Sequence, residues 1–201
     1  MSKKITIIDY GMGNLYSVQN ALKAIGAEPV VTSDAAVIAQ AEKILLPGVG
    51  AFGDCMANLE RSGLIPVIMD SLKSGKPFLG ICLGMQLLFE GSDEAPGVKG
   101  LGFFKGQVKL LRTELKIPHM GWNKLELRSL SPLLEGAEGE YVYFVHSFHA
   151  EPEDSSIITS VCDYGMEVTA SVGRGNVQAF QFHPEKSSSV GMRLLKNFVE
   201  L

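Results

Sequence analysis

The stretch KPFLGICLGMQLLF, residues 76–89, places Cys82 between two glycines, where an apolar run typical of a strand meets an apolar run typical of a helix. A sharp strand-to-helix turn of this kind holds a nucleophile in a strained backbone conformation. Gly80 and Gly84 carry no Cβ and would let the strand and the helix approach closely. The sequence therefore predicts a nucleophile elbow with Cys82 at its tip.

The surroundings of Cys82 favour a reactive thiolate. The start of a helix offers unpaired backbone N–H groups and a positive dipole end, both of which stabilise the anion. The N–H of Leu83 is then a candidate oxyanion donor, and the Gly-rich turn at 47–50 can supply a second one from Val49. The competing interpretation is a small buried thiol with no chemical role, which is the usual state of a free cysteine and the one expected for Cys55 and Cys162.

A base for this nucleophile is found near the C-terminus. The run VQAFQFHPE, residues 177–185, ends an apolar strand in His-Pro-Glu. A strand period of two, kept extended by Pro184, would place His183 and Glu185 on one side of the backbone. Glu185 could then orient the imidazole as the third member of a triad does. A solvated loop after an edge strand is the alternative for this segment taken alone.

Outward from the elbow, short apolar runs alternate with helical periodicity in the first half of the chain. This pattern predicts a mostly parallel central sheet flanked by helices, with a smaller antiparallel or mixed sheet in the C-terminal half. Strands are expected at 5–8, 29–32, 43–46, 77–81, 100–111, 121–127, 141–148, 157–162, 168–172 and 177–182. Helices are expected at 15–25, 34–41, 56–62, 66–74, 83–89 and 189–199.

Composition sets limits on partners and location. The chain has 201 residues, of which 46% are hydrophobic and 20% charged, enough apolar material for one domain spanning 1–201. A net charge of −4 argues against a dominant nucleic-acid surface. Three dispersed cysteines indicate a reducing, cytoplasmic setting. The apolar runs are too short for a secretory signal or a membrane span.

Taken together, these motifs resemble those of the class I, or triad, glutamine amidotransferases, and the resemblance covers essentially the whole chain. It implies a flavodoxin-like three-layer fold. The segments that carry it are DYGMGNL (9–15), LPGVGAF (46–52), GICLGMQ (80–86), MGWN (120–123), YFVHSF (143–148) and QFHPEKS (181–187). Within the family, the opening segment, MGWN and the Lys-Ser after His-Pro-Glu point to the glutaminase subunits that serve histidine biosynthesis.

The resemblance implies a reaction in which Cys82 attacks the carboxamide of glutamine, forms a thioester and releases ammonia, with His183 and Glu185 in the other triad positions. It implies no cofactor and no metal. Ammonia would pass to a cyclase subunit, HisF, a (β/α)₈ barrel bound as a heterodimer, which makes imidazole glycerol phosphate and aminoimidazole carboxamide ribonucleotide. The residues implied to bind glutamine are Gly48, Gly50, Gln86, Glu94, His146, Ser147 and Phe148, and those implied to meet the cyclase are Asn14, Trp122 and Lys186.

Other functions compete with this one. A dinucleotide-binding protein is suggested by Gly11-x-Gly13 after the first strand, but the third glycine of that fingerprint is replaced by Tyr16, which we expect to obstruct helix packing. A stand-alone cysteine hydrolase and a catalytically silent interaction module are the other two. His146 and His149 could be metal ligands, yet a spacing of three on a strand places them on opposite faces.

Overall fold

The computed structural model describes residues 3–201, and its centre is an eight-stranded sheet in the order β2-β1-β3-β4-β12-β11-β10-β7. Five neighbouring strands are parallel: β1 (Lys4–Ile8), β2 (Glu28–Thr32), β3 (Ile44–Gly48), β4 (Phe78–Cys82) and β12 (Val177–Phe180). Strand β4 lies between β3 and β12, so three chain segments distant in sequence end side by side. The carboxyl ends of these three strands carry the residues predicted to react.

Antiparallel strands extend the sheet beyond β12. They are β11 (Glu167–Arg174), β10 (Ile158–Asp163) and the short β7 (Glu126–Leu127). Two further two-stranded antiparallel sheets pair β5 (Gly106–Leu110) with β9 (Phe148–Pro152) and β6 (His119–Lys124) with β8 (Tyr141–His146). The predicted fold class, a mostly parallel central sheet with helices and a smaller antiparallel part, is confirmed.

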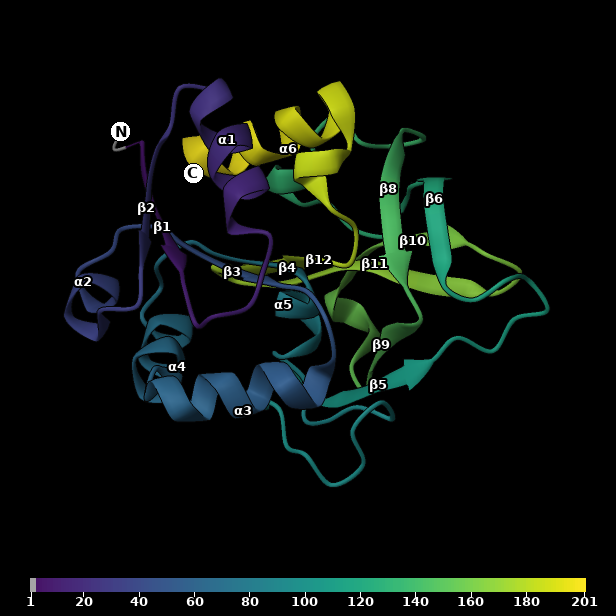
Figure 1. The fold of residues 1–201 in the computed structure, drawn as a ribbon. Coiled ribbons are helices and arrows are strands. Elements are labelled where there is room, and N and C mark those ends of the chain that lie inside the picture. The colour runs from purple at the N-terminus through teal and green to yellow at the C-terminus, as the bar shows by residue number, and fades with distance from the viewer. Residues whose placement is uncertain (1–2) are drawn as a thin grey trace.

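Helices cover both faces of the sheet (Figure 1). One face carries α1 (Leu15–Ala24) and α6 (Ser188–Glu200), and the other carries α3 (Phe52–Ser62), α4 (Ile65–Lys73) and the one-turn α5 (Leu83–Gln86), with α2 (Ala35–Ala39) packed on α4. Single 3₁₀ turns form at η1 (Pro132–Leu134), η2 (Ser155–Ile157) and η3 (Pro184–Lys186). The result is a three-layer arrangement.

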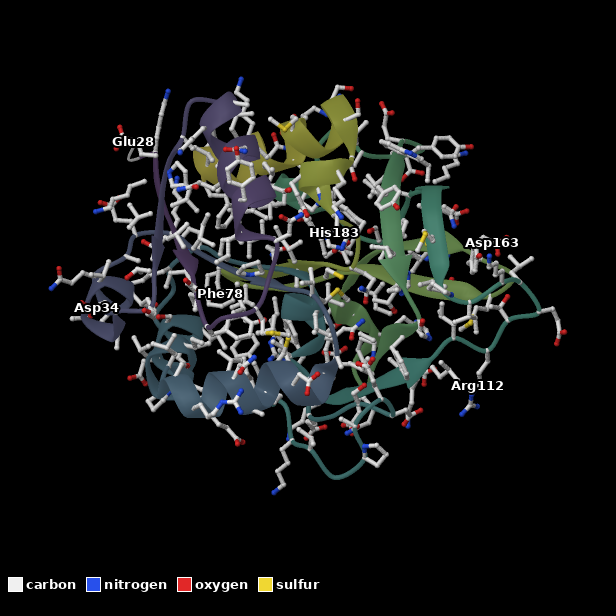
Figure 2. The ribbon with its side chains drawn as sticks, in the orientation of Figure 1. Glu28, Asp34, Phe78, Arg112, Asp163 and His183 are labelled. Carbon is white, nitrogen blue, oxygen red and sulfur yellow. The ribbon has the colours of Figure 1, made fainter. Side chains whose placement is uncertain are left out.

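The alternation of side chains along β3 shows why two cores form. Ile44 and Leu46 belong to the core under α3 and α4, whereas Leu45 between them belongs to the core under α1 and α6. A strand that is buried on both faces must be apolar throughout, which explains its continuous hydrophobic run. Figure 2 shows side chains filling the space on both sides of the sheet, with Phe78 among them.

The helix predicted over 83–89 is too long, because α5 ends at Gln86. The carbonyls of Leu87 and Phe89 accept hydrogen bonds from the N–H groups of Leu101 and Gly102, and the carbonyl of Leu88 accepts one from Phe104. They hold residues 87–89 against this distant loop, and the N–H groups of Leu88 and Phe89 bond to the carbonyls of Met85 and Gln86, three residues back, in a tight turn that ends the helix. The longer-range bonds also hold 100–104 as a loop, so the strand predicted over 100–111 shrinks to β5.

Two smaller expectations also differ from the structure. The strand predicted over 141–148 is broken at Ser147 into β8 and β9, which belong to different small sheets. Tyr16 is 75% exposed on α1, so it does not obstruct helix packing as expected. Among residues 3–201 no helix is long and apolar enough to cross a membrane.

Candidate active site

The backbone at Cys82 has φ 55° and ψ −113°, a conformation that L-residues rarely adopt. This turn sends the chain from β4 directly into α5. The glycines make it possible, since a Cβ on Gly84 would lie 2.0 Å from the carbonyl oxygen of Leu46, and one on Gly48 would lie 2.7 Å from the backbone nitrogen of Gly84. At the elbow, the backbone of α5 therefore packs directly on the backbone of β3.

His183 follows β12, the strand on the other side of β4. Its Nδ1 lies 2.8 Å from Oε1 of Glu185, and both side chains are almost completely buried. His183 has the extended backbone predicted for the residue before Pro184, but the extended conformation expected to continue to Glu185 is wrong, because Glu185 lies in the 3₁₀ turn η3. A tight turn also brings the two side chains together, so the expected pair forms on a different backbone.

The imidazole of His183 and the sulfur of Cys82 line the same cavity, and the two groups interact through charge. Because Nδ1 is engaged by Glu185, the nitrogen that faces the sulfur is Nε2. Burial lowers the pKa of His183, but the hydrogen bonds and charges of Cys82 and Glu185 outweigh it and raise that pKa to about 10. The ring therefore carries a proton at neutral pH.

His119 and His146, in contrast to His183, have lowered pKa values. Burial lowers the pKa of His119 to about 4 and that of His146 to about 3. Nδ1 of His146 lies 2.8 Å from the carbonyl oxygen of Phe148, which can only accept, so this nitrogen carries the proton. Nε2 of His146 then accepts from Nδ1 of His119 at 3.0 Å. Both nitrogens of His146 are occupied inside the protein, and neither faces a ligand.

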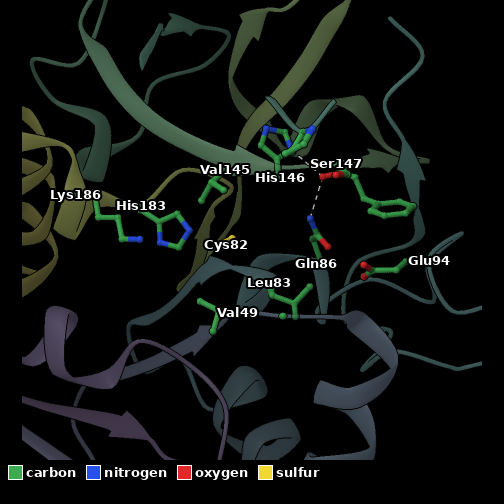
Figure 3. Close-up of a pocket in the computed structure, with 13 residues that line it drawn as sticks. Val49, Cys82, Leu83, Gln86, Glu94, Val145, His146, Ser147, His183 and Lys186 are labelled. Carbon is green, nitrogen blue, oxygen red and sulfur yellow. Dashed lines mark hydrogen bonds between the residues drawn. The ribbon is translucent and has the colours of Figure 1, made fainter. Parts of the chain in front are cut away.

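A cavity of about 390 Å³ opens over the elbow (Figure 3). Its size is within the range of small-molecule sites. Figure 3 shows His183, Gln86 and Glu94 around this space, with Cys82 at its floor. The residues that line it are Val49, Gly50, Cys82, Leu83, Gln86, Glu94, Pro118, Val145, His146, Ser147, Phe148, His183 and Lys186.

Most of the predicted site residues line this cavity, and four do not. Gly48 lies beneath the elbow against Gly84, and Glu185 lies behind His183. The side chain of Asn14 caps α1 by accepting from the N–H of Ser17 at 3.3 Å. Trp122 is half-exposed on β6.

Two cavity residues have fixed orientations. The Glu94 carboxylate accepts the N–H of Phe52 at 2.8 Å, which ties it to the start of α3. Gln86 donates from Nε2 to the carbonyl of Phe148 at 3.0 Å and to Oε1 of Gln181 at 2.9 Å. With both protons of Nε2 used, Gln86 has only Oε1 left for a ligand.

The sequence interpretation did not include Gln181, which is fully buried and whose Nε2 lies 3.8 Å from Sγ of Cys82. Pro118 and Val145, two lining residues, were also missed. For Gln181 a signal existed: it precedes His183 by two positions in the predicted strand 177–182, and a period of two places both on one face. No comparable signal identifies Pro118 or Val145.

The other two cysteines lie apart from the cavity. Burial raises the pKa of Cys162 to about 12, and burial also raises that of Cys55. Cys55 donates to the carbonyl of Val49 at 3.5 Å and accepts from the hydroxyl of Tyr10 at 3.6 Å. Both are neutral buried thiols. Across residues 3–201 no group of three or more His, Cys, Asp or Glu side chains could hold a metal ion.

An aromatic surface adjoins the cavity. Trp122 and Tyr143 meet edge to face at 6.1 Å, and the ammonium of Lys186 lies 6.0 Å from the Tyr143 ring. Lys186 also lines the cavity. Met120 and Tyr141 on the same two-stranded sheet are 60% and 55% exposed.

Comparison with known proteins agrees with this geometry. The family model described as "Glutamine amidotransferase class-I" matches residues 6–201. The chain is 53% identical to the imidazole glycerol phosphate synthase subunit HisH of Aquifex aeolicus, covering 97% of this chain and 95% of the relative. It is 51% identical to the HisH of Methanothermobacter thermautotrophicus, covering 98% of each.

Solved structures support the fold. A structure titled "Crystal structure of glutamine amidotransferase" superposes with a TM-score of 0.77 at 19% identity, covering 97% of both chains. The structure of PurLQS from Thermotoga maritima superposes with a TM-score of 0.78 at 21% identity, covering 100% of this chain and 99% of the other. The chain belongs to the class-I glutamine amidotransferase family, among the HisH subunits of imidazole glycerol phosphate synthase.

Proposed function

We propose that this chain is the glutaminase subunit of an imidazole glycerol phosphate synthase, hydrolysing glutamine to glutamate and ammonia and supplying the ammonia to a HisF cyclase subunit. The observation that carries the proposal is that Cys82, at a strained strand-to-helix turn, and the buried His183–Glu185 pair meet at the wall of one cavity. That arrangement occurs on a chain about half identical to HisH proteins.

In the first step the Cys82 thiolate attacks the side-chain carbonyl carbon of glutamine. A carbon–sulfur bond forms, and the carbonyl π electrons move to the oxygen. The His183 imidazolium then gives its proton to the amide nitrogen, the carbon–nitrogen bond breaks and ammonia leaves. The product is a γ-glutamyl thioester beside a neutral imidazole.

In the second step water replaces the thiol. Neutral His183 takes a proton from the water as it attacks the thioester carbon, and collapse of the intermediate expels the Cys82 thiolate. Glutamate is released and the imidazolium is restored. Glu185 keeps the imidazole in the orientation that both transfers need.

The oxyanion is stabilised by backbone N–H groups. Leu83 is the first residue of α5, where no helical carbonyl can accept its N–H, and Val49 follows β3 at the cavity wall. Two preorganised donors of this kind are each worth about 3 kcal/mol of barrier.

Glutamine is held by the remaining polar groups of the cavity. The Glu94 carboxylate faces the cavity and suits the α-ammonium group, while Oε1 of Gln86 accepts from the substrate. The backbone around Gly50 and from His146 to Phe148 completes the enclosure.

The cyclase binds the aromatic surface beside the cavity, with Trp122, Lys186 and Asn14 at the contact. Support comes from the exposed aromatic and sulfur-containing side chains there, residue types that are enriched in protein interfaces. We further propose that residues 1–201 form one glutaminase domain, and that the protein works in the cytoplasm, where its three free thiols stay reduced.

The test is the variant Cys82→Ala in the complex with the cyclase. Glutamine-dependent synthesis should disappear, whereas synthesis from added ammonium salt should persist because the cyclase chemistry lies in the other subunit. Glutamate release by the wild-type chain should rise when the cyclase and its substrate are added. Release that is equally fast without the partner would favour a stand-alone hydrolase, and loss of both syntheses in the variant would refute the division of labour.

A further inference from the structure

The orientation of the Gln181 carboxamide is fixed by a chain of hydrogen bonds that begins at a backbone carbonyl. The Phe148 carbonyl can only accept, so Gln86 must present Nε2 to it. The same Nε2 donates to Gln181, which must therefore present Oε1 to Gln86. Gln181 is left with Nε2, a group that can only donate, directed at Sγ of Cys82 at 3.8 Å.

We propose that Gln181 is a further catalytic residue, whose side-chain N–H donates a hydrogen bond to the Cys82 sulfur and stabilises its thiolate. The proposal deepens the proposed function and rests on Cys82 being the nucleophile. Gln86 is a positioning residue in this scheme, because it touches the sulfur only through Gln181.

The burial of the Gln181 amide strengthens its hydrogen bond to the sulfur. Gln181 is fully buried and Gln86 nearly so, so water does not compete for the donor. A hydrogen bond to a charged group is stronger than one between neutral groups, and more so away from solvent. An N–H that can only donate favours a sulfur without a proton over a thiol.

The helix after Cys82 is short, so its dipole leaves part of the stabilisation of the thiolate to other donors. Because α5 has a single turn, only a few peptide dipoles point at the sulfur, fewer than the helix predicted over 83–89 would supply. The amide of Gln181 supplies a side-chain donor to the sulfur instead, and the ring of His183 lies in the same cavity.

Three titratable groups act on the sulfur, and any pH experiment must allow for them. His183, Tyr10 and Cys55 all interact with it through charge. Burial raises the pKa of Tyr10 far above its usual value and raises that of Cys55, so both stay neutral near pH 7. The charge beside the sulfur near neutral pH is then that of His183.

The amide contributes at both steps of the proposed reaction. It increases the fraction of sulfur present as thiolate before attack. It also stabilises the thiolate that leaves when water breaks the thioester, because a better-stabilised leaving group departs faster. Gln181 does not reach the cavity, so its loss should reduce kcat and leave KM for glutamine nearly unchanged.

Two variants test the hydrogen-bond donor of Gln181 separately from the packing of its side chain. Gln181→Glu keeps the volume and the acceptor for Gln86 but replaces the N–H that faces the sulfur with an oxygen. Gln181→Met removes both polar atoms. The matched control is Gln178→Met on β12, the strand that Gln181 follows; its amide contacts Ser131 and Gly175 away from the cavity.

The measurements are glutamine turnover with the cyclase and the rate of Cys82 alkylation by iodoacetamide between pH 5 and 10. Both Gln181 variants should lose about tenfold or more in kcat, with KM changed less than about threefold, and the midpoint of the alkylation profile should move up by about 1. Gln178→Met should match the wild type. Wild-type kcat and midpoint in a folded Gln181 variant would overturn the proposal.

A measurement on the unaltered side chain covers the case in which both variants fail to fold. In ¹⁵N-labelled wild-type protein, the side-chain amide resonance of Gln181 should move as Cys82 ionises, and Cys82→Ala should abolish that movement. A resonance that moves identically in both proteins would reject the hydrogen bond. A wild-type chain that hydrolyses no glutamine would instead refute the proposed function, so the two failures are distinguishable.

Discussion

The Glu185 side chain is a carboxylate with one partner. It is 1% exposed, its Oε1 contacts His183, and its Oε2 is one of two buried side-chain atoms without a hydrogen bond among residues 3–201. Burying a carboxylate is costly unless an opposite charge is close. The imidazolium of His183 is that charge, so the pair is coupled in stability as well as in the proposed chemistry.

The first prediction follows from this coupling. His183→Ala leaves Glu185 buried with no partner, and breaking a buried pair in this way costs about 3–5 kcal/mol. Urea unfolding at pH 8 measures it, with Cys82→Ala as the comparison that keeps the pair intact. The double variant His183→Ala/Glu185→Gln should recover part of the loss. If His183→Ala lost under about 1 kcal/mol, the single-partner description of Glu185 would be wrong.

The second prediction concerns Glu185→Gln. Removing the carboxylate lowers the pKa of His183 and loosens the ring, so glutamine turnover should fall by about 10²- to 10⁴-fold, less than in Cys82→Ala. The alkaline limb of the activity profile, where the imidazolium loses its proton, should move below about pH 10. Rates measured from pH 6 to 10.5 decide this, and an unmoved limb would show that Glu185 does not hold the proton on His183.

The raised pKa of His183 also makes the unfolding free energy depend on pH in a defined direction. The pKa of His183 is about 10 in the folded protein and about 6.5 in an unfolded chain. Its contribution to the unfolding free energy is therefore fully present below pH 6.5 and is lost as pH rises through 10. Between these values the wild type should lose stability with pH more steeply than Glu185→Gln, and parallel slopes would argue against a raised pKa.

At the scale of elements, the elbow depends on two backbones in contact. The Cβ of an alanine at position 84 would meet the Leu46 carbonyl at 2.0 Å, and a backbone carbonyl in a central strand cannot move aside. The third prediction is that Gly84→Ala destabilises the protein by more than about 3 kcal/mol, through overpacking.

The matched control for Gly84→Ala is Gly53→Ala in α3. Its Cβ would meet only the Cβ of Ala95, at 3.3 Å, and alanine favours the helix. Its unfolding free energy should stay within about 1 kcal/mol of the wild type. Equal losses in the two variants, measured by urea unfolding, would show that the close approach at Gly84 is not the cause.

The same elements show what sequence can predict. The parallel strands are predictable because continuous apolar runs end at Gly or Pro, as at Pro47 and Gly48, a pattern set by local sequence. The end of α5 is not predictable, because the residues that follow it are held by hydrogen bonds to the loop at 100–104, which is distant in sequence. The chain of buried histidines likewise depends on the register that pairs His119 with His146 across β6 and β8.

The candidate site divides in the same way. Cys82, His183 and Glu185 lie in short motifs whose residue types indicate a nucleophile, a base and an orienting carboxylate. The sequence is therefore enough to identify them. Gln181 lies in one of those motifs, but nothing local says that its amide faces sulfur. That orientation follows from Phe148 and Gln86, which tertiary structure places beside it.

At the scale of the whole molecule, the cavity and the aromatic surface are continuous through Lys186, which lines the one and lies over Tyr143 of the other. A partner on that surface would sit beside the place where ammonia is released. Ammonia that diffuses through water is lost and protonated. Its transfer between two active sites therefore requires a short distance between the subunits. The heterodimer proposed above would form on β6 and β8.

The last prediction tests that surface. Trp122 is 52% exposed and packs on Tyr143, so Trp122→Ala removes a large aromatic anchor without opening a core. Anchors of this kind contribute 2 kcal/mol or more, so the Kd for the cyclase should rise about 30-fold in calorimetric titration, with the urea midpoint unchanged. Leu130→Ala is the control, since Leu130 is fully exposed and lies in another groove, beside Pro132 and Leu134. A weakened complex in both variants, or in neither, would place the cyclase elsewhere.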